Sequence, residues 1–502
     1  MEPYILKKLY LLPLVMGVWI SCGMIICFIM ALSEGHVSAY VPFISETGGK
    51  LPESGIFGIF LVFTASFGMA VMTIRYLIVS ELNEGGIRKI DILNKISVFV
   101  GYLSLCGMII VGCYPMYGII SAHLTGALLL FFGGLLYGIL QTILTFWMYP
   151  TYNGISIFRI RLVICTLCIL SLLTAFIVIP IARKYSNKIM PRADKVPSDK
   201  GFTEILIIAV CEWILAMSFI SFFFTFVREF RKVTLHLSLV PLVRHFDDEV
   251  KMEPYILKKL YLLPLVMGVW MFCGMIICFI MALLEGHVSA YVPFISETGG
   301  KLPESGIFGI FLVFTAYMGM AVMTTRYLIV SELNEGGMRK IDILNKISVF
   351  VGYLSLCGMI IVGCYPMYGL ISAHLTGALL LFFGCLFYGI LQTILTFWMY
   401  PTYNGISIFR IRLAISTFCI LFLITMTIVF PLGQRFWNQS KPKADKVPSD
   451  KGFTEILTSA VCEWFLAMSF IFFFFTFVRE FRKVTLRLSL VPLVRHFDDE
   501  VS

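Results

Sequence analysis

The chain has 502 residues, of which 59% are hydrophobic and only 14% are charged, and its mean hydropathy is +0.90. These values lie far above those of a soluble globular domain, so they exclude that class and indicate an integral membrane protein. The formal net charge of +9 requires no nucleic acid to explain it, and membrane lipids are the partners that we expect.

Six apolar stretches of at least about 18 residues follow one another in the first half, the length that a helix needs to cross roughly 30 Å of hydrocarbon. They lie near residues 9–32, 55–79, 96–118, 121–148, 162–182 and 204–227. Runs such as 127–132 lack the polar alternation of membrane-barrel strands. The first stretch is longer than the core of a typical signal peptide and has no cleavage pattern near its end, so we expect a permanent helix.

The sequence then begins again, because residues 252–501 match residues 1–250 at a constant offset of 251. Only about 33 of roughly 250 aligned pairs differ, and about 18 of these lie between Val163 and Arg192. We therefore predict an all-α integral membrane protein with two domains, 1–250 and 252–502, each a repeat of six transmembrane helices. An even number of spans makes the repeats parallel. Met252 stands where a free-standing copy would begin, which leaves open a tandem fusion or two adjacent genes read as one.

Lysine and arginine counts predict the orientation. With a cytosolic N-terminus, the cytosolic segments of the first half carry 13 such residues and the opposite side carries 7. The bias predicts that both termini are cytosolic, although the basic loop at 183–203 is an exception. Asn438 begins an N-glycosylation sequon in the luminal loop of the second half, so it is a candidate glycosylation site.

Few ionisable groups lie at membrane depth. Glu212 falls about nine residues into the last helix of the first half, and a charged carboxylate there is costly unless it faces the bundle interior and finds a partner. His123 and Arg75 are its candidate partners. A structural pair that only fixes helix packing is the alternative. The counterparts of these three residues in the second half are Glu463, His374 and Arg326.

Other motifs carry weaker signals. The sequence shows no catalytic, cofactor-binding or metal-binding pattern, so we expect no enzyme and no cofactor. His36, Glu46 and Glu53 of the first luminal loop match no known metal spacing and are expected to be solvated. Arg228, Arg231 and Lys232 would share one face of a continued last helix, where they suit anionic lipids of the cytosolic leaflet or simply anchor the helix. The residues from Val233 to Pro241 alternate in polarity, which leaves a short strand or an interfacial segment open.

Several of these motifs together resemble the damage-regulated autophagy modulator (DRAM) family. The resemblance is carried by the loop pattern from Gly35 to Gly58, the Arg75-Tyr76 pair, Cys211-Glu212-Trp213 and the run from Phe222 to Leu235, and it covers nearly all of each half. It implies a six-span protein of the lysosomal or late endosomal membrane that modulates autophagy, without established catalytic residues. The doubling departs from the family pattern.

Two alternatives remain at this stage. The wider superfamily of the resemblance includes plasma-membrane proteins linked to phosphoinositide kinases, which implies a regulator at the plasma membrane. A small-solute or ion transporter is the other alternative, in which the intramembrane Glu212 and His123, with Arg75, would line the path.

Overall fold

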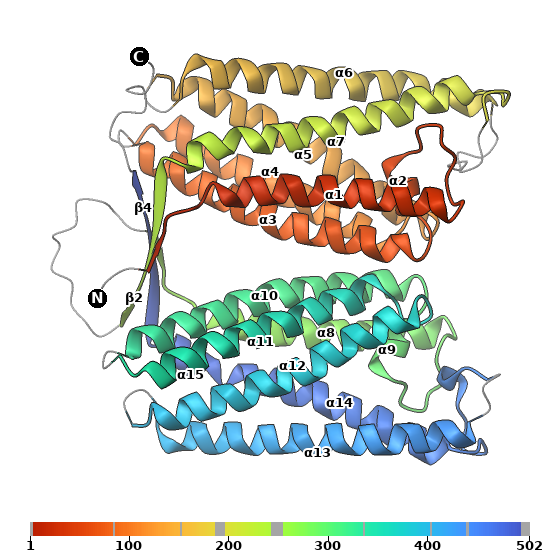
Figure 1. Cartoon of the computed structure of the whole chain (residues 1–502), viewed down its shortest axis with the longest axis vertical. Coiled ribbons are helices and arrows are strands. Elements are labelled where there is room, and N and C mark those ends of the chain that lie inside the picture. Colours follow the sequence, from red (N-terminus) through yellow and green to blue (C-terminus); the bar gives the residue numbers. More distant parts are fainter. Residues whose placement is uncertain are drawn as a thin grey trace. The chain divides into compact units, whose positions relative to one another are not determined.

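The computed structural model describes residues 4–83, 86–150, 153–185, 196–241, 255–334, 337–401, 404–437 and 441–492. The chain divides into two compact units, one formed mainly by residues 4–236 and the other mainly by residues 237–488. Each unit is a bundle of long helices that lie side by side (Figure 1). Twelve helices in the described part are long and apolar enough to cross a membrane, which confirms an all-α membrane protein of two six-helix repeats.

The described residues of the first half form six long helices, one short loop helix and two strands. Its elements are β1 (Tyr4–Leu6), α1 (Leu11–Ser33), α2 (Ile44–Thr47), α3 (Glu53–Leu82), α4 (Arg88–Cys113), α5 (Ile120–Trp147), α6 (Ile155–Tyr185), α7 (Phe202–Phe230) and β2 (Val233–Pro241).

The second half repeats this order and has a break near the end of its last span, and its described residues include a short 3-10 helix whose counterpart in the first half lies outside the described residues. Its elements are β3 (Tyr255–Leu257), α8 (Leu262–Leu284), α9 (Ile295–Thr298), α10 (Glu304–Leu333), α11 (Arg339–Cys364), α12 (Ile371–Trp398), α13 (Ile406–Phe436), η1 (Lys443–Asp445), α14 (Phe453–Phe475), α15 (Phe477–Phe481) and β4 (Val484–Pro492).

Small residues allow α4 and α5 to approach closely. A side chain added at Gly107 would meet the backbone oxygen of Gly126 at 2.6 Å, and the pair Gly358 and Gly377 repeats this contact in the second half. Such close backbone approach is the usual basis of helix packing in membranes, where apolar side chains gain little from leaving lipid. These glycines therefore set the spacing of the two helices.

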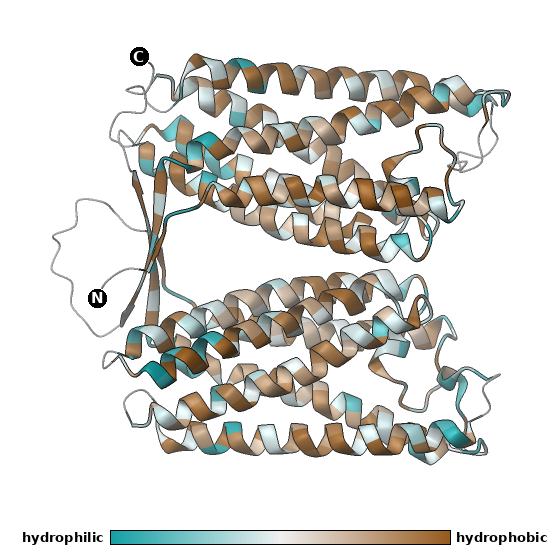
Figure 2. Cartoon of the chain, viewed as in Figure 1, coloured by the Kyte–Doolittle hydropathy of each residue, from teal (hydrophilic) through white to brown (hydrophobic). Residues whose placement is uncertain are grey.

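The outer surface of each bundle is apolar. Hydrophobic residues cover the middle of the helices, whereas hydrophilic residues gather near the helix ends (Figure 2). On α6, Leu170 is 55% exposed and Ile177 is 66% exposed. Helices that expose large apolar side chains outside their packing face are stable only in hydrocarbon. Lipid therefore covers this surface.

The strands lie at the end of the helices opposite α2 and α9 (Figure 1). β1 is the neighbour of β2 in the first half. In the second half, β3 pairs antiparallel with β4, with Tyr255 opposite Leu488 and Leu257 opposite Leu486. Of the two possibilities left open for residues 233–241, the strand is the correct one. We call this the strand end of each bundle, and the end that carries α2 or α9 the loop-helix end.

Candidate functional site

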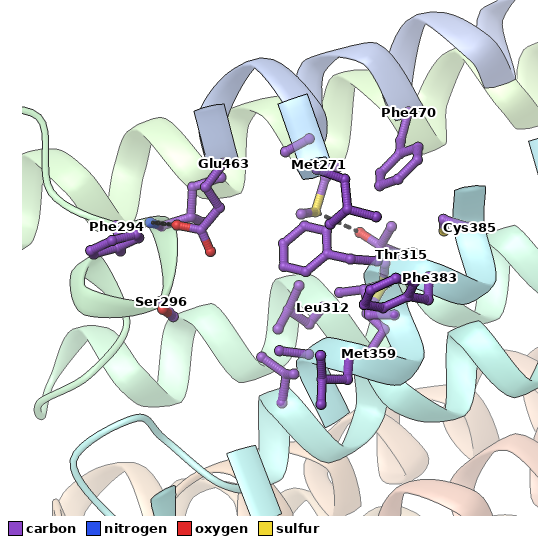
Figure 3. Close-up of a pocket in the computed structure, with 18 of the residues that line it drawn as sticks. Met271, Phe294, Ser296, Leu312, Thr315, Met359, Phe383, Cys385, Glu463 and Phe470 are labelled. Carbon is purple, nitrogen blue, oxygen red and sulfur yellow. Dashed lines mark hydrogen bonds between the residues drawn. The ribbon is translucent and has the colours of Figure 1, made fainter. Parts of the chain in front are cut away.

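Each half contains a cavity between its helices. Its volume is about 430 Å³ in the first half and about 400 Å³ in the second half, within the range of small-molecule pockets. Figure 3 shows the second cavity, whose wall is apolar over most of its length. Wall residues that contribute only carbon or sulfur include Met271, Leu312, Met359, Phe383, Cys385 and Phe470.

Polar groups gather where this cavity meets the loop helix α9. The backbone N–H of Ile295 donates to Oε2 of Glu463, on α14, over 2.8 Å. The next residue of α14, Trp464, donates its indole N–H to the carbonyl oxygen of Pro293 over 2.8 Å. Ser296 also lines the cavity at this end (Figure 3). Two adjacent side chains of the last span thus hold the loop helix against the bundle.

The first half has the same arrangement. The backbone N–H of Ile44 donates to Oε2 of Glu212 over 3.1 Å, and the indole N–H of Trp213 donates to the carbonyl oxygen of Pro42 over 2.8 Å. Ser45 supplies further hydrogen bonds to Glu212. The structure therefore gives the Glu-Trp pair of the last span a physical role, because it satisfies the backbone of a loop that enters the bundle.

His123 lines the same cavity as Glu212. Its Nδ1 lies 2.7 Å from the carbonyl oxygen of Tyr114. A carbonyl only accepts, so Nδ1 must carry a proton, and in the neutral ring Nε2 remains an acceptor. His374 bonds the carbonyl oxygen of Tyr365 in the same way, over 2.7 Å, and lines the second cavity with Glu463. The structure thus brings Glu212 and His123 to one cavity without an ion pair between them.

Arg75 lies elsewhere, and its predicted pairing with Glu212 is wrong. Its Nη1 is 3.2 Å from Oε2 of Glu229, and its Nε donates to Oε1 of Gln141 over 3.0 Å. Arg161 reaches the same carboxylate, with Nη2 2.7 Å from Oε1 of Glu229. All these side chains are buried near the strand end. Arg326 and Arg412 share Glu480 in the second half, at 2.8 and 2.7 Å.

The network has one carboxylate for two guanidinium groups, so it is rich in positive charge. An aromatic face stabilises part of this charge, because Cζ of Arg161 lies 4.6 Å from the ring centroid of Phe226. Glu229 was not predicted from the sequence, because Glu229 lies between the exposed Arg228 and Arg231 and this charged segment is typical of a cytosolic tail. The available signal was its spacing, since Glu229 falls one helical turn after Phe226 on the buried face of α7.

The carboxylates of the first loop are buried rather than solvated, so that expectation is wrong. Glu46 and Glu53 are 1% and 0% exposed. His36 pairs with Glu53 through Nδ1, and the matching pair of His287 and Glu304 is separated by 2.5 Å. These contacts fix the loop onto the start of the second span. Among the described residues, no three His, Cys, Asp or Glu side chains are placed to hold a metal ion.

The basic cluster differs from its expected helical geometry. The helix α7 ends at Phe230, so Arg231 and Lys232 form the turn into β2 rather than a further helical turn. Cζ of Arg231 lies 5.2 Å from the ring centroid of Tyr10. Arg228 and Arg231 are exposed, and their suitability for anionic lipids stays a prediction. The candidate glycosylation site at Asn438 lies outside the described residues.

Known proteins match each half separately. The sequence model of the Frag1/DRAM/Sfk1/Cwh43P N-terminal domain matches residues 8–233 and again residues 259–484. The DNA damage-regulated autophagy modulator protein 1 of Mus musculus is 35% identical over 233 residues, which are 46% of this chain and 95% of the relative.

Two further relatives show how far the similarity extends. The DNA damage-regulated autophagy modulator protein 2 of Homo sapiens is 34% identical over 237 residues, covering 46% of this chain and 88% of the relative. The modulator of macroautophagy TMEM150B of Danio rerio is 26% identical over 228 residues, covering 45% of this chain and 87% of the relative. No solved structure matches the chain significantly. One half of the chain corresponds to nearly a whole relative, and the chain belongs to the Frag1/DRAM/Sfk1/Cwh43P family as a tandem duplication of its domain.

Proposed function

We propose that this protein modulates autophagy and resides in lysosomal or late endosomal membranes with both termini in the cytosol. The observation that carries the role is the family membership of both halves, since relatives at 35% and 34% identity are named autophagy modulators. The motif from Gly35 to Gly58, with its buried carboxylates, supports the same assignment. The proposed location follows from the resemblance of this loop to DRAM proteins.

The test is to remove the endogenous protein and to restore the full chain with an added tag. We expect turnover of an autophagosome marker, compared with and without lysosomal inhibition, to fall on removal and to recover on restoration. We expect the tagged chain to co-fractionate with lysosomal membranes. Normal turnover without the protein would contradict the role, and a steady-state location confined to the plasma membrane would favour a phosphoinositide-linked regulator instead.

Anionic lipids of the cytosolic leaflet are proposed partners of the strand end. Arg228 and Arg231 are exposed beside the half-buried Lys232, and each such charge near an anionic surface contributes about 1 kcal/mol. Purified protein should bind vesicles that contain an anionic phosphoinositide more tightly than neutral vesicles. Replacement of these three residues and of their counterparts Arg479, Arg482 and Lys483 by Gln should remove the difference.

The cavity favours regulation over transport of a hydrophilic solute. Ion and solute paths are lined by polar groups along their length, whereas the glutamate, histidine and serine here lie at one end and the remaining wall is apolar apart from Arg183 and threonines such as Thr64 and Thr315. Flux of a hydrophilic solute through reconstituted protein that disappears on replacing Glu212 and Glu463 would reverse this preference.

A further inference from the structure

We propose that the cavity of each half binds one membrane lipid whose headgroup donates hydrogen bonds, either a hydroxyl or an amine, and whose apolar part is a single chain or a fused ring system. The headgroup would lie between the glutamate and the histidine at the loop-helix end. This proposal concerns a binding site and does not depend on the role in autophagy.

The polar end of the cavity offers hydrogen-bond acceptors. In the second half, Oε2 of Glu463 accepts from the N–H of Ile295, and no hydrogen bond to its Oε1 is found among the described residues. In the first half, Ser45 as well as Ile44 bonds Glu212. Because Nδ1 of His374 donates to a backbone carbonyl, its Nε2 is also an acceptor in the neutral ring. An amine can donate to both atoms and a hydroxyl to one of them, whereas hydrocarbon can donate to neither.

The polar groups that the two cavities share argue against an anionic headgroup. The polar residues that line both cavities are a glutamate, a histidine, a serine of the loop helix and a threonine of the second span: Glu212, His123, Ser45 and Thr64 in the first half, and Glu463, His374, Ser296 and Thr315 in the second half. Arg183 lines the first cavity only, and no cationic side chain of the described residues lines the second. An ionised phosphodiester or carboxylate has no hydrogen to donate to the glutamate or the histidine, so the features common to both cavities select a neutral or cationic headgroup.

The apolar wall and the volume define the remainder of the ligand. The cavities of about 400 and 430 Å³ lie at the lower end of the range for ligand pockets, which is roughly 300–1,000 Å³. Their walls are formed mostly by Met, Leu, Ile and Phe. This space suits one alkyl chain or one ring system, and it is too small for the two chains of a phospholipid.

The cavity opens sideways toward the bilayer. Leu128 of α5 lines the first cavity and is nevertheless 53% exposed, and Leu379 of α12 lines the second cavity and is 57% exposed. Leu124 and Leu375, one helical turn earlier, share both properties. Because the outer surface of these helices faces hydrocarbon, a lipid reaches the cavity from the membrane without crossing water.

The experiment uses purified full-length protein in lipid nanodiscs and three photoreactive, clickable probes. These are a long-chain amino alcohol, a sterol with a free hydroxyl, and palmitic acid as the anionic control. We expect saturable labelling by the amino alcohol or the sterol that excess unlabelled lipid of the same kind suppresses, with cross-linked peptides in the cavity wall. Palmitic acid should label about tenfold less or weaker still.

Matched variants separate the cavity from the general lipid surface. Leu128→Trp with Leu379→Trp should reduce labelling about tenfold by filling both openings. The control is Leu103→Trp with Leu354→Trp, which should leave labelling unchanged. Leu103 and Leu354 are 42% and 43% exposed but line neither cavity. Glu212→Gln with Glu463→Gln preserves an oxygen acceptor, so it should weaken the amine more than the hydroxyl.

A single elution peak and an unchanged unfolding temperature will show that each variant is folded. If the tryptophan variants do not fold, competition and peptide mapping on the unmodified protein decide the question. Equal labelling by all three probes, labelling without competition, or equal labelling of both tryptophan pairs would overturn the proposal.

Discussion

Replacing Glu229 by Leu should destabilise the first half more than any substitution of an exposed residue. Glu229 is 1% exposed and holds two buried guanidinium groups, with N to O distances of 3.2 Å to Arg75 and 2.7 Å to Arg161. Its loss leaves two like charges in a region without water. Breaking a buried ion pair by removing one partner costs about 3–5 kcal/mol, and here a single carboxylate serves two pairs, so the upper part of that range applies.

The neighbouring residue provides the control. Arg228→Leu removes an exposed charge one position earlier on α7 and should change stability by less than about 0.5 kcal/mol. Thermal unfolding of the purified full chain in detergent measures both variants. At about 2–4 °C per kcal/mol for a unit of this size, Glu229→Leu should lower the unfolding temperature of the first half by about 8–20 °C. Equal unfolding temperatures for the two variants would refute the idea that this network stabilises the bundle.

Three further predictions follow from the same structure. Glu212→Leu should lower the free energy of unfolding by about 1–3 kcal/mol, less than Glu229→Leu, because it leaves the buried N–H of Ile44 without its acceptor. Full retention of stability would mean that water replaces the carboxylate. A C-terminal tag should be digested by protease added outside sealed organelles, as the 13 to 7 charge bias requires, and protection of the tag would reverse the topology. Burial raises the pKa of Glu297, against the opposing charge of Lys446, so its contribution to stability is full below its unfolded pKa of about 4.3 and is lost as the pH rises through its folded value. The unfolding temperature of the wild type minus that of Glu297→Gln should therefore increase as the pH falls from about 7 to about 4.5. A difference independent of pH would contradict the assignment.

The number and order of the spans could be predicted from hydropathy alone, but two of the helix starts could not. The third and fifth helices begin at Arg88 and Ile155, about seven residues before the apolar stretches at 96 and 162. Their first turns contain charged residues, including Lys89, Asp91 and Arg159. Hydropathy detects the part of a helix that lies in hydrocarbon, so turns that extend into the headgroup region are invisible to it.

The polar contacts were harder to predict for a different reason. Glu212 and His123 were recognised because each stands alone in an apolar run, and the structure places both on one cavity. Glu229 was missed because its partners Arg75 and Arg161 are 154 and 68 positions away in the chain. Charge patterns along a sequence report neighbours on one helix, whereas a six-helix bundle brings together residues from spans that are distant in sequence. The choice of partner is therefore a property of the packing.

The two ends of each bundle use buried polar groups in opposite ways. At the strand end, Arg75 and Arg161 each contact Glu229, and Gln141 accepts from Arg75 and donates to Ser97, so these contacts join the helices of this end in one arrangement. At the loop-helix end, the hydrogen bond found for Glu463 among the described residues is to one of its oxygens, and Glu463 shares a cavity with an acceptor nitrogen of His374. The ion pairs of the strand end line neither cavity, whereas the glutamate and histidine of the loop-helix end line a cavity that a ligand can enter. Substitutions at the strand end should therefore act on folding, while conservative substitutions at the loop-helix end should act on what the protein binds.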